Sequence, residues 1–423
     1  MKKTMVLALV MTFMFSIAYA DTVKDGFGKA TLSDSSVYEG EFKDGLFNGK
    51  GKLTWRDGSN YEGEFKDGLI NGKGISIRRD GSKYEGEFKD GLPNGTGLST
   101  YREGSTYKGE FKDGIENGKG VMVRRDGMRY EGDFKDGIMN GKGVLTYADG
   151  SSLEGEFHEG VLNGDGSLVY PGGTKYSGEV KNNLPDGNGT MTWPNGNVYK
   201  GEFKAGKPHG KGRETDVDGG VMEGSFVNGV AEGGMAIKRA DGYSYEGNLK
   251  QGKPTGRGKE VWPSGTEYNG DYVNGRYEGS GVLKYDNGDV YEGEFKKDKR
   301  CGKGTLTFKS GMKYEGEFKD GNPDGKGRVT KPNGDVYEGD FKDGRMEGHI
   351  ILTNPDGYRF EGEFKNNLGN GKGVVVLQNG DKYEGDIVND KFEGYGVYTS
   401  ANGARMEGLF KENKYVGPAP VKK

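Results

Sequence analysis

The chain has 423 residues, of which 82 are glycine, 31% are hydrophobic and 30% are charged, and its formal net charge is −4. So few apolar residues exclude a large globular core, and glycine without a Gly-X-Y period, with only 12 prolines, excludes collagen. The 25 tyrosines and 20 phenylalanines argue against disorder, so the composition indicates a repetitive, aromatic-rich fold.

The first predicted element is a secretory signal peptide over residues 1–20. Lys2–Lys3 precede the apolar run Met5–Ile17, and Ala18–Ala20 form a small-x-small cleavage site. The alternative, a membrane anchor, is disfavoured because the run is too short to span a bilayer comfortably. We therefore expect cleavage after Ala20 and a periplasmic or secreted protein.

The remaining chain has features of a protein without a transmembrane segment. No second long apolar run follows, and the single cysteine, Cys301, excludes an internal disulfide bond. Without Lys2–Lys3 the net charge is −6, which disfavours nucleic acid or an anionic membrane as a partner.

A repeat of 23 residues, without insertion or deletion, fills the rest of the chain. Its first copy is YEGEFKDGLFNGKGKLTWRDGSN at residues 38–60, and we number its leading aromatic residue position 0. The repeat predicts an N-terminal half-repeat cap at 21–37, sixteen complete repeats at 38–405, and a C-terminal half-repeat with a tail at 406–423. The leading residues are Tyr38, Tyr61, Tyr84, Tyr107, Tyr130, Leu153, Tyr176, Tyr199, Met222, Tyr245, Tyr268, Tyr291, Tyr314, Tyr337, Phe360, Tyr383 and Met406.

Two strands are predicted in each repeat. Alternation in Tyr61–Lys66 places the two rings on one face and the charges on the other, which is typical of a half-buried strand at positions 0 to 5. A second strand is predicted at positions 12 to 17. If the intervening loop spans positions 6 to 11, phenylalanine at position 4 pairs with glycine at position 13.

Two loops join these strands. Position 7 holds only Gly, Asn or Asp, the residues that tolerate a positive φ, so its backbone is predicted to be left-handed. Glycine at position 20, preceded in five repeats by proline at position 18, predicts a type I turn followed by a left-handed bulge. Five further prolines at position 9 are assigned to the first loop, which keeps proline out of the strands.

The segment GLFNGKG, Gly45–Gly51, resembles the start of a phosphate-binding loop. Such a loop needs Ser or Thr after its lysine and a helix after that, whereas here Gly51 follows Lys50 and glycine is too frequent for a helix. We therefore interpret the segment as a hairpin loop and the beginning of a strand.

The pattern Tyr-x-Gly-x-Phe-x-x-Gly-x-x-x-Gly-x-Gly, repeated from Asp25 to Gly417, resembles the MORN repeat family. The resemblance implies an all-β fold: an elongated, single-layer, twisted antiparallel sheet of successive β-hairpins, with aromatic residues along a shallow groove. Some members of that family carry a kinase or methyltransferase domain after the repeats, and others are linked to membranes or scaffolding. No such domain follows here, so the resemblance implies no enzymatic activity.

No catalytic, metal-binding or cofactor-binding residues are predicted. His158, His209 and His349 lie several repeats apart and cannot form one site, and Cys301 is interpreted as a surface thiol. Glu214–Gly219 resembles a calcium loop but lacks its closing acid. The carboxylates at positions 1 and 3 and the lysines at positions 5 and 12 are interpreted as a solvated face, with an anion-binding track as the alternative.

The sequence therefore predicts a non-enzymatic, exported scaffold that presents a long aromatic-lined groove to a protein partner. The alternative is a glycan- or lipid-binding surface protein, and self-association through open sheet edges is a further possibility. Residues 206–245 are the least regular, because Met222 replaces tyrosine and Met235 replaces glycine. They are predicted to be a soft joint and a possible partner site, with neutral drift as the alternative.

Overall fold

The computed structural model describes residues 23–419, so the predicted signal peptide lies outside the described residues. The chain divides into two compact units, Met1–Gly210 and Lys211–Lys423. Between residues 23 and 419 there are strands and turns and no helix. No helix of this described part is therefore long and apolar enough to cross a membrane.

The strands of both units alternate between a shorter and a longer type. The first unit contains β1 (Gly26–Thr31), β2 (Val37–Lys43), β3 (Leu46–Thr54), β4 (Asn60–Lys66), β5 (Leu69–Ile77), β6 (Lys83–Lys89), β7 (Leu92–Thr100), β8 (Thr106–Lys112), β9 (Ile115–Val123), β10 (Arg129–Lys135), β11 (Ile138–Thr146), β12 (Ser152–His158), β13 (Val161–Val169), β14 (Lys175–Lys181), β15 (Leu184–Thr192) and β16 (Val198–Lys204). The division falls within β17 (Lys207–Thr215). The second unit continues with β18 (Val221–Val227), β19 (Val230–Lys238), β20 (Ser244–Lys250), β21 (Lys253–Val261), β22 (Glu267–Val273), β23 (Arg276–Lys284), β24 (Val290–Lys296), β25 (Lys299–Thr307), β26 (Lys313–Lys319), β27 (Asn322–Thr330), β28 (Val336–Lys342), β29 (Arg345–Thr353), β30 (Arg359–Lys365), β31 (Leu368–Val376), β32 (Lys382–Val388), β33 (Lys391–Thr399), β34 (Arg405–Lys411) and β35 (Lys414–Gly417).

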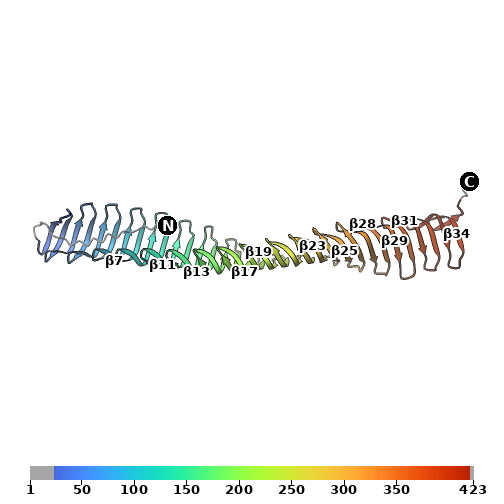
Figure 1. Ribbon diagram of the computed structural model, residues 1–423, viewed down its shortest axis with the longest axis horizontal. Coiled ribbons are helices and arrows are strands. Elements are labelled where there is room, and N and C mark those ends of the chain that lie inside the picture. Colours follow the sequence, from blue (N-terminus) through green and yellow to red (C-terminus); the bar gives the residue numbers. More distant parts are fainter. Residues whose placement is uncertain (1–22, 420–423) are drawn as a thin grey trace. The chain divides into compact units, whose positions relative to one another are not determined.

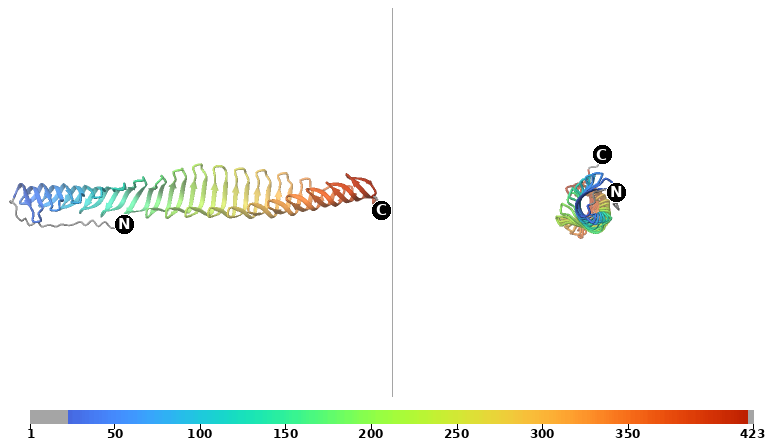
Figure 2. Two further views of the ribbon diagram at one scale, coloured as in Figure 1. Left: turned by 90° about the horizontal axis from the view of Figure 1, so that it is seen from above. Right: turned by 90° about the vertical axis from the view of Figure 1, so that its left-hand side faces the viewer.

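Consecutive strands pair antiparallel from β1 to β16 in the first unit and from β18 to β35 in the second. In the first unit β2 pairs with β1 and β3, and in the second unit β25 pairs with β24 and β26. The strands of each unit therefore follow one another side by side in chain order (Figure 1). A second view of each unit shows the same succession of hairpins in a single layer (Figure 2). The predicted all-β fold of successive antiparallel hairpins is confirmed.

The first loop of the repeat is shorter than predicted. β2 ends at Lys43 and β3 begins at Leu46, so only positions 6 and 7 form the loop. Asp44 and Gly45 both have positive φ, 52° and 77°, which is typical of a type I′ hairpin turn. The left-handed backbone at position 7 is confirmed, but the loop at positions 6 to 11 was wrong, and the second strand begins at position 8 instead of 12.

The second loop has the predicted geometry. The Gly58 N–H donates to the carbonyl of Trp55 across a four-residue turn, and Gly58 then has φ of 92°. The Ser59 N–H donates to Asp57, which fixes the turn from its second central residue. The type I turn with a left-handed glycine bulge is therefore confirmed.

The predicted pairing of phenylalanine with glycine was wrong because a bulge shifts the register within each hairpin. Gly40 pairs with Gly51, and Phe42 pairs with Phe47, so position 2 faces position 13 and position 4 faces position 9. Between these pairs the single residue Glu41 faces three residues of β3, Asn48–Lys50, and Gly49 at position 11 among them has φ of 77°. Glycine at position 11 is thus required by a left-handed bulge.

Proline is present in the strands, contrary to prediction. Pro93 lies in β7 and Pro323 in β27, each at position 9. Their carbonyls accept the N–H of Gly114 and Gly344 from the next repeat, at 2.9 and 2.8 Å. At this position the missing N–H faces a neighbouring turn instead of the strand ladder, so proline is tolerated.

The irregular repeat that begins at Met222 has a substitute core. Met235 is 3% exposed, and its Sδ atom occupies the space beside Gly224 that a tyrosine ring fills in other repeats. Met222 replaces the tyrosine of other repeats, and Met235, which replaces a glycine, fills the space that this tyrosine would occupy. The softness predicted for this segment stays a prediction.

Candidate functional site

The leading tyrosines lie on pairs of glycines, on what we call the aromatic face of each unit. A Cβ atom on Gly63 or Gly74 would meet the Tyr61 hydroxyl at 2.4 or 2.3 Å, so only glycine leaves room for the ring. Tyr61 then donates its hydroxyl to the carbonyl of Glu64, at 3.0 Å. This packing explains glycine at positions 2 and 13.

Phenylalanine at position 4 completes an aromatic ladder. Tyr61 contacts Phe65 of its own repeat and Phe88 of the next, with centroids 5.2 and 5.0 Å apart and near-perpendicular rings. Such edge-to-face contacts are favourable beyond the area that they bury. The ladder joins successive repeats into a continuous core.

The ladder is a core and not a ligand-binding surface. Tyr61, Tyr107 and Tyr291 are 0% exposed, and burial raises the pKa of Tyr107 to about 12. An aromatic-lined groove was predicted as the surface that meets a partner, and its rings were interpreted mainly as structural packing. The buried leading rings pack on the glycines and on each other, which agrees with that interpretation and leaves contacts with a partner to other positions.

Position 9 varies most on the aromatic face and lies against the ladder. Phe47 stacks on Tyr38 with centroids 3.8 Å apart, and the Arg300 guanidinium lies 5.6 Å from the centroid of Tyr291. Glu116 occupies the same position and accepts the hydroxyl of Tyr101, and burial raises its pKa. The repeats thus differ in chemistry at position 9 while they share one core.

Position 17 supplies the rings that remain partly exposed on the aromatic face. These residues are Trp55, Tyr101, Tyr147, Tyr170, Trp193, Trp262, Tyr285 and Phe308.

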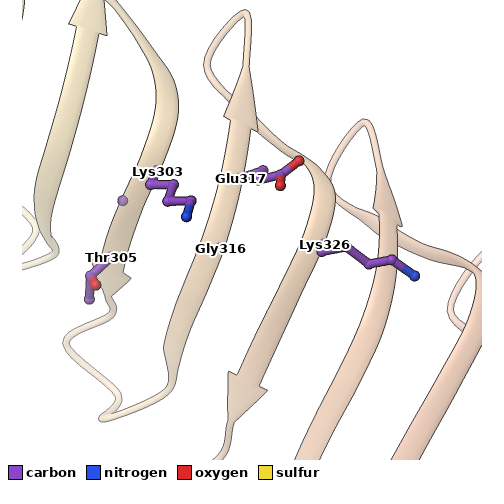
Figure 3. Close-up of a pocket in the computed structure, with 6 residues that line it drawn as sticks. Lys303, Thr305, Gly316, Glu317 and Lys326 are labelled. Carbon is purple, nitrogen blue, oxygen red and sulfur yellow. The ribbon is translucent and has the colours of Figure 1, made fainter.

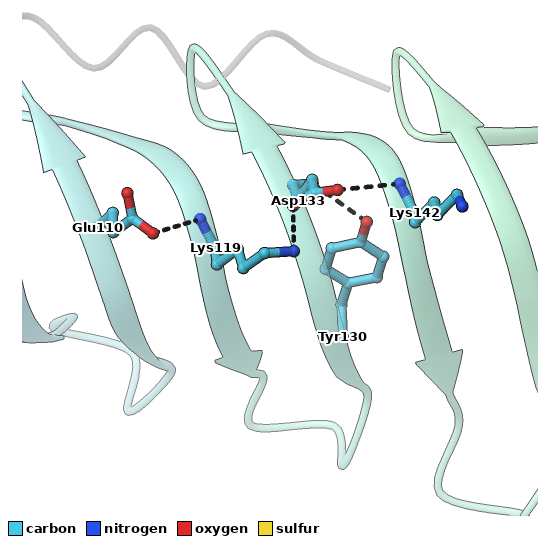
Figure 4. Close-up of polar contacts among 5 residues, drawn as sticks. All are labelled: Glu110, Lys119, Tyr130, Asp133 and Lys142. Atoms are coloured by element: carbon cyan, nitrogen blue, oxygen red, sulfur yellow. Dashed lines mark hydrogen bonds and ion pairs between the residues drawn. The ribbon is translucent and has the colours of Figure 1, made fainter.

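The opposite, outward face carries carboxylates with a structural role. Figure 4 shows Glu110 and Asp133 turned toward the backbone N–H groups of Lys119 and Lys142, at 3.2 Å each. These N–H groups follow directly on the position 11 bulge, and each donates to a position 3 carboxylate. The Lys119 ammonium also bridges to Asp133 at 3.1 Å. Position 3 therefore stabilises the bulge, which the prediction of a solvated charge ladder missed.

The outward face of the first unit also carries an apolar stripe. Aliphatic residues stand at position 14 of four successive repeats and at position 16 of two of them, and three of these residues, Ile77, Leu98 and Val123, are each 38% exposed. We define the apolar stripe as Ile75, Ile77, Leu98, Val121, Val123 and Val144. Sequence reasoning missed it, although counting residue types at position 14 across the repeats would have revealed it.

A shallow hollow lies on the outward face of the second unit. It is lined by Lys303, Gly304, Thr305, Gly316, Glu317 and Lys326. Figure 3 shows Lys303, Glu317 and Lys326 extending from three neighbouring strands without converging on one point. Two lysines and one carboxylate in this arrangement provide no catalytic constellation.

The titratable residues singled out in the sequence are not brought together. His158 ends β12, His349 lies in β29 near Glu361 at 3.6 Å, and burial raises the pKa of Cys301, which disfavours the reactive thiolate. Cys301 lies in β25 and not in the turn where it was predicted. Between residues 23 and 419 no three His, Cys, Asp or Glu side chains are arranged to hold a metal ion.

The Glu214–Gly219 segment forms an ordinary turn. Asp216 accepts the N–H groups of Asp218 and Gly220 at 3.0 and 2.7 Å, so its carboxylate closes the turn from within. Glu214 lies beside Asp216, and its pKa is raised by burial and by that neighbour. The segment is a turn with a nearby acidic pair.

The fold defines a β-hairpin repeat protein in which the core of each unit is built on one face of a single-layered sheet. The MORN repeat family model matches fifteen segments, at 38–60, 61–83, 84–106, 107–129, 130–152, 154–175, 176–198, 199–221, 245–267, 268–290, 291–313, 314–336, 337–357, 360–382 and 383–405. The chain therefore belongs to the MORN repeat family. Residues 222–244, with their methionine core, are outside these matches.

Other comparisons add little. A search of curated proteins finds no match to the sequence. The TCP domain of SAS-4 (dCPAP) from Drosophila melanogaster, solved with a proline-rich motif of Ana2, is 16% identical over 43% of this chain and 86% of that one, with a TM-score of 0.22. Virginiamycin B lyase from Staphylococcus aureus, solved with quinupristin, is 12% identical over 70% and 96%, with a TM-score of 0.12. Likeness at this level supports no conclusion about this chain.

Proposed function

We propose that the protein is an exported, non-enzymatic scaffold that binds a protein partner through the apolar stripe. The exposed and half-buried aliphatic side chains of β5, β7, β9 and β11 carry this proposal. Exposed apolar patches rimmed by polar residues are typical of protein interaction sites.

The surroundings of the stripe fit a protein interface. Between the aliphatic strands, β6 and β10 present the ion pairs Lys83–Glu85 and Arg129–Glu131, at 2.7 and 2.5 Å. Leu98 lies opposite Lys108 on β8. A repeat of two strands advances by about 10 Å, so charged and apolar rows alternate along the stripe. An apolar centre with charged rims is the usual anatomy of a protein interface.

The stripe is tested by placing charge on it. The full chain carrying Leu98→Glu and Val121→Glu is compared with the wild type in capture and cross-linking from the periplasmic and secreted fractions of the producing cell. We expect the captured partner to decrease at least about tenfold, because a carboxylate at the centre of an apolar contact is desolvated without compensation.

A matched control introduces the same charges at the same repeat position, but outside the stripe. Ser167→Glu and Thr190→Glu change the same position 14 in two other repeats of the first unit, which have no stripe. They should leave capture within about twofold of the wild type. Equal capture by all three proteins would contradict binding through the stripe.

Export is the second part of this proposal, and the N-terminal sequence supports it. Intact mass of the protein recovered outside the cytoplasm is expected to correspond to a chain that begins at Asp21. Recovery of a chain that retains Met1 would refute cleavage after Ala20.

A glycan-binding surface is the second candidate function. It is favoured by the partly exposed rings at position 17, which in the first unit stand in the successive repeats of Tyr147, Tyr170 and Trp193. Aromatic faces in a regular row can stack on the units of an extended polymer. Alanine at Tyr170 and Trp193 should then abolish retention on a glycan array and leave capture of a protein partner unchanged.

A further inference from the structure

One repeat of the second unit has a carboxylate on its aromatic face. Glu260 occupies position 15 of β21, where Leu283 and Leu306 stand in the next two repeats. Its Oε1 atom accepts the hydroxyl of Tyr243 at 2.7 Å. Its Oε2 atom accepts the hydroxyls of Tyr272 and Tyr277 at 3.0 and 3.2 Å. Three tyrosine hydroxyls, from the repeats before and after that of Glu260, thus converge on one carboxylate.

The fold does not require this cluster. The Glu260 carboxylate is reached by Tyr272, which stands at position 4 of the next repeat. Other repeats carry leucine at position 15 and phenylalanine at position 4 of the following repeat: Leu53 and Phe65, Leu145 and Phe157, Leu283 and Phe295, and Leu306 and Phe318. Here both positions are polar, with Glu260 and Tyr272. Since polar networks in such places are rarely more stable than apolar packing, the exchange indicates a function other than stability.

The negative charge of Glu260 has no cationic partner. Between residues 23 and 419 no lysine, arginine or histidine nitrogen lies within 4.0 Å of its carboxylate. The nearby guanidinium of Arg239 lies instead over the ring of Tyr243, 4.4 Å from its centroid. Glu260 is half-buried, so part of it faces solvent.

Aromatic rings border the carboxylate. Trp262 and Tyr277, both half-buried, lie edge to face with centroids 6.3 Å apart. Ring faces attract cations, and Arg239 already uses the ring of Tyr243 in this way. A single carboxylate beside partly exposed rings is suited to an ammonium or guanidinium group and provides too few oxygens for a metal ion.

We propose that Glu260, Tyr277 and Trp262 form a subsite that binds a lysine or arginine side chain of a protein partner. The proposal rests on the proposed protein-binding function and specifies the charge of the partner. The cation pairs with the open side of the Glu260 carboxylate, while the three phenol hydroxyls hold that carboxylate in place. The aliphatic stem of the partner's lysine or arginine side chain lies against the rings of Tyr277 and Trp262.

The probe is a fluorescent pentalysine peptide with blocked ends, titrated against the full-length protein at moderate ionic strength. The test variant is Glu260→Leu with Tyr272→Phe, which installs the pair found in the repeats of Leu283 and Leu306. We expect this variant to bind the peptide about tenfold more weakly than the wild type, with an unchanged or higher melting temperature. Peptide acetylated on its lysines should bind all proteins weakly and alike.

The control removes the same charge from the same hairpin. Glu246→Leu changes an exposed carboxylate on the outward face of β20, and it should leave pentalysine affinity within about twofold of the wild type. Equal affinities of both variants, whether weakened or unchanged, would overturn the subsite. Capture through the apolar stripe does not involve Glu260, so failure of the subsite and failure of the proposed function are distinguishable.

Discussion

At the scale of single residues, positions 7 and 9 of neighbouring repeats are coupled by one hydrogen bond. Where position 7 is Asn or Asp, its side chain accepts the N–H of position 9 in the previous repeat, as Asn183 does from Leu162 and Asn367 from Met346, both at 2.8 Å. Where position 9 is proline, as at Pro323, no N–H exists and position 7 is glycine, here Gly344. The residue type at position 7 of one repeat therefore depends on the residue at position 9 of the repeat before it.

Substitutions at Gly321 test this explanation. Its φ is 97° and no atom lies within 4 Å of an added Cβ, so only backbone strain opposes a side chain. Gly321→Val should lower the free energy of unfolding by about 1–2 kcal/mol, because a β-branched residue resists this conformation. Gly321→Asn should be close to the wild type, since it can accept the N–H of Arg300.

Gly344→Asn is the matched control, because its new side chain faces Pro323, which has no N–H to donate. It should be less stable than Gly321→Asn by about 1 kcal/mol, the contribution of one hydrogen bond. Urea unfolding of the variants measures these differences. Identical midpoints for Gly321→Val and Gly321→Asn would refute the argument from backbone conformation.

At the scale of the hairpin, the two carboxylates of a strand have different roles. Glu64 accepts the Lys73 N–H beside the position 11 bulge at 3.0 Å, whereas Glu62 forms an exposed ion pair with Lys52 at 3.6 Å. We expect Glu64→Ala to lower the free energy of unfolding by about 1 kcal/mol and Glu62→Ala by less than about 0.5 kcal/mol. Equal losses in urea unfolding would show that position 3 has no special role.

The methionine core of β18 and β19 allows a test of compensation. Met235→Gly alone should destabilise by about 3 kcal/mol because it empties the space beside Gly224, and Met222→Tyr alone should overpack it. The double variant restores the tyrosine-on-glycine packing of other repeats and should return within about 1 kcal/mol of the wild type. Additive losses would mean that Met235 does not replace the ring.

The same segment carries the prediction of a soft joint. Amides of residues 222–239 should exchange with solvent faster than those of residues 291–307, because Met222 stands where most repeats have a rigid tyrosine ring. Hydrogen exchange followed by mass spectrometry compares the two segments directly. Equal protection would favour neutral drift over softness.

At the scale of the hairpin, sequence reasoning succeeded where a residue type reports directly on the backbone. Glycine and proline at positions 18 and 20 revealed the second loop. The extent of the first loop was predicted wrongly because the positive φ at position 6 is adopted by seven aspartates and otherwise by Asn, Glu, Gln, Lys or Ala, a mixture that does not report on the backbone. The bulge at Gly49 was missed although position 11 holds glycine in every repeat, and it shifted the register within the hairpins.

At the scale of the whole molecule, the 23-residue period predicted the family and the fold class, because each repeat carries the same pattern. The binding surface was predicted less well. Sequence shows that rings share a face, but their burial depends on the glycine pair beneath each tyrosine and on the ring of the next repeat. The apolar stripe is a run of successive repeats with aliphatic residues at position 14, and the Glu260 cluster is a departure from the repeat, so both emerge only when repeats are compared with one another.

The central claim is that the leading tyrosines form the core of the protein and are not part of a binding surface. Burial raises the pKa of Tyr38, Tyr84, Tyr130 and Tyr314 from 10.0 to about 12. The folded chain therefore keeps protons that the unfolded chain loses, so its stability is complete below pH 10 and declines as the pH rises toward about 12.

A spectrophotometric titration of tyrosine, with circular dichroism followed on the same samples, tests this claim most directly. We predict that most tyrosines ionise late, in a steep step near pH 12 that coincides with loss of the sheet signal. Ionisation of all 25 tyrosines in one broad step near pH 10, with the sheet signal intact, would contradict it.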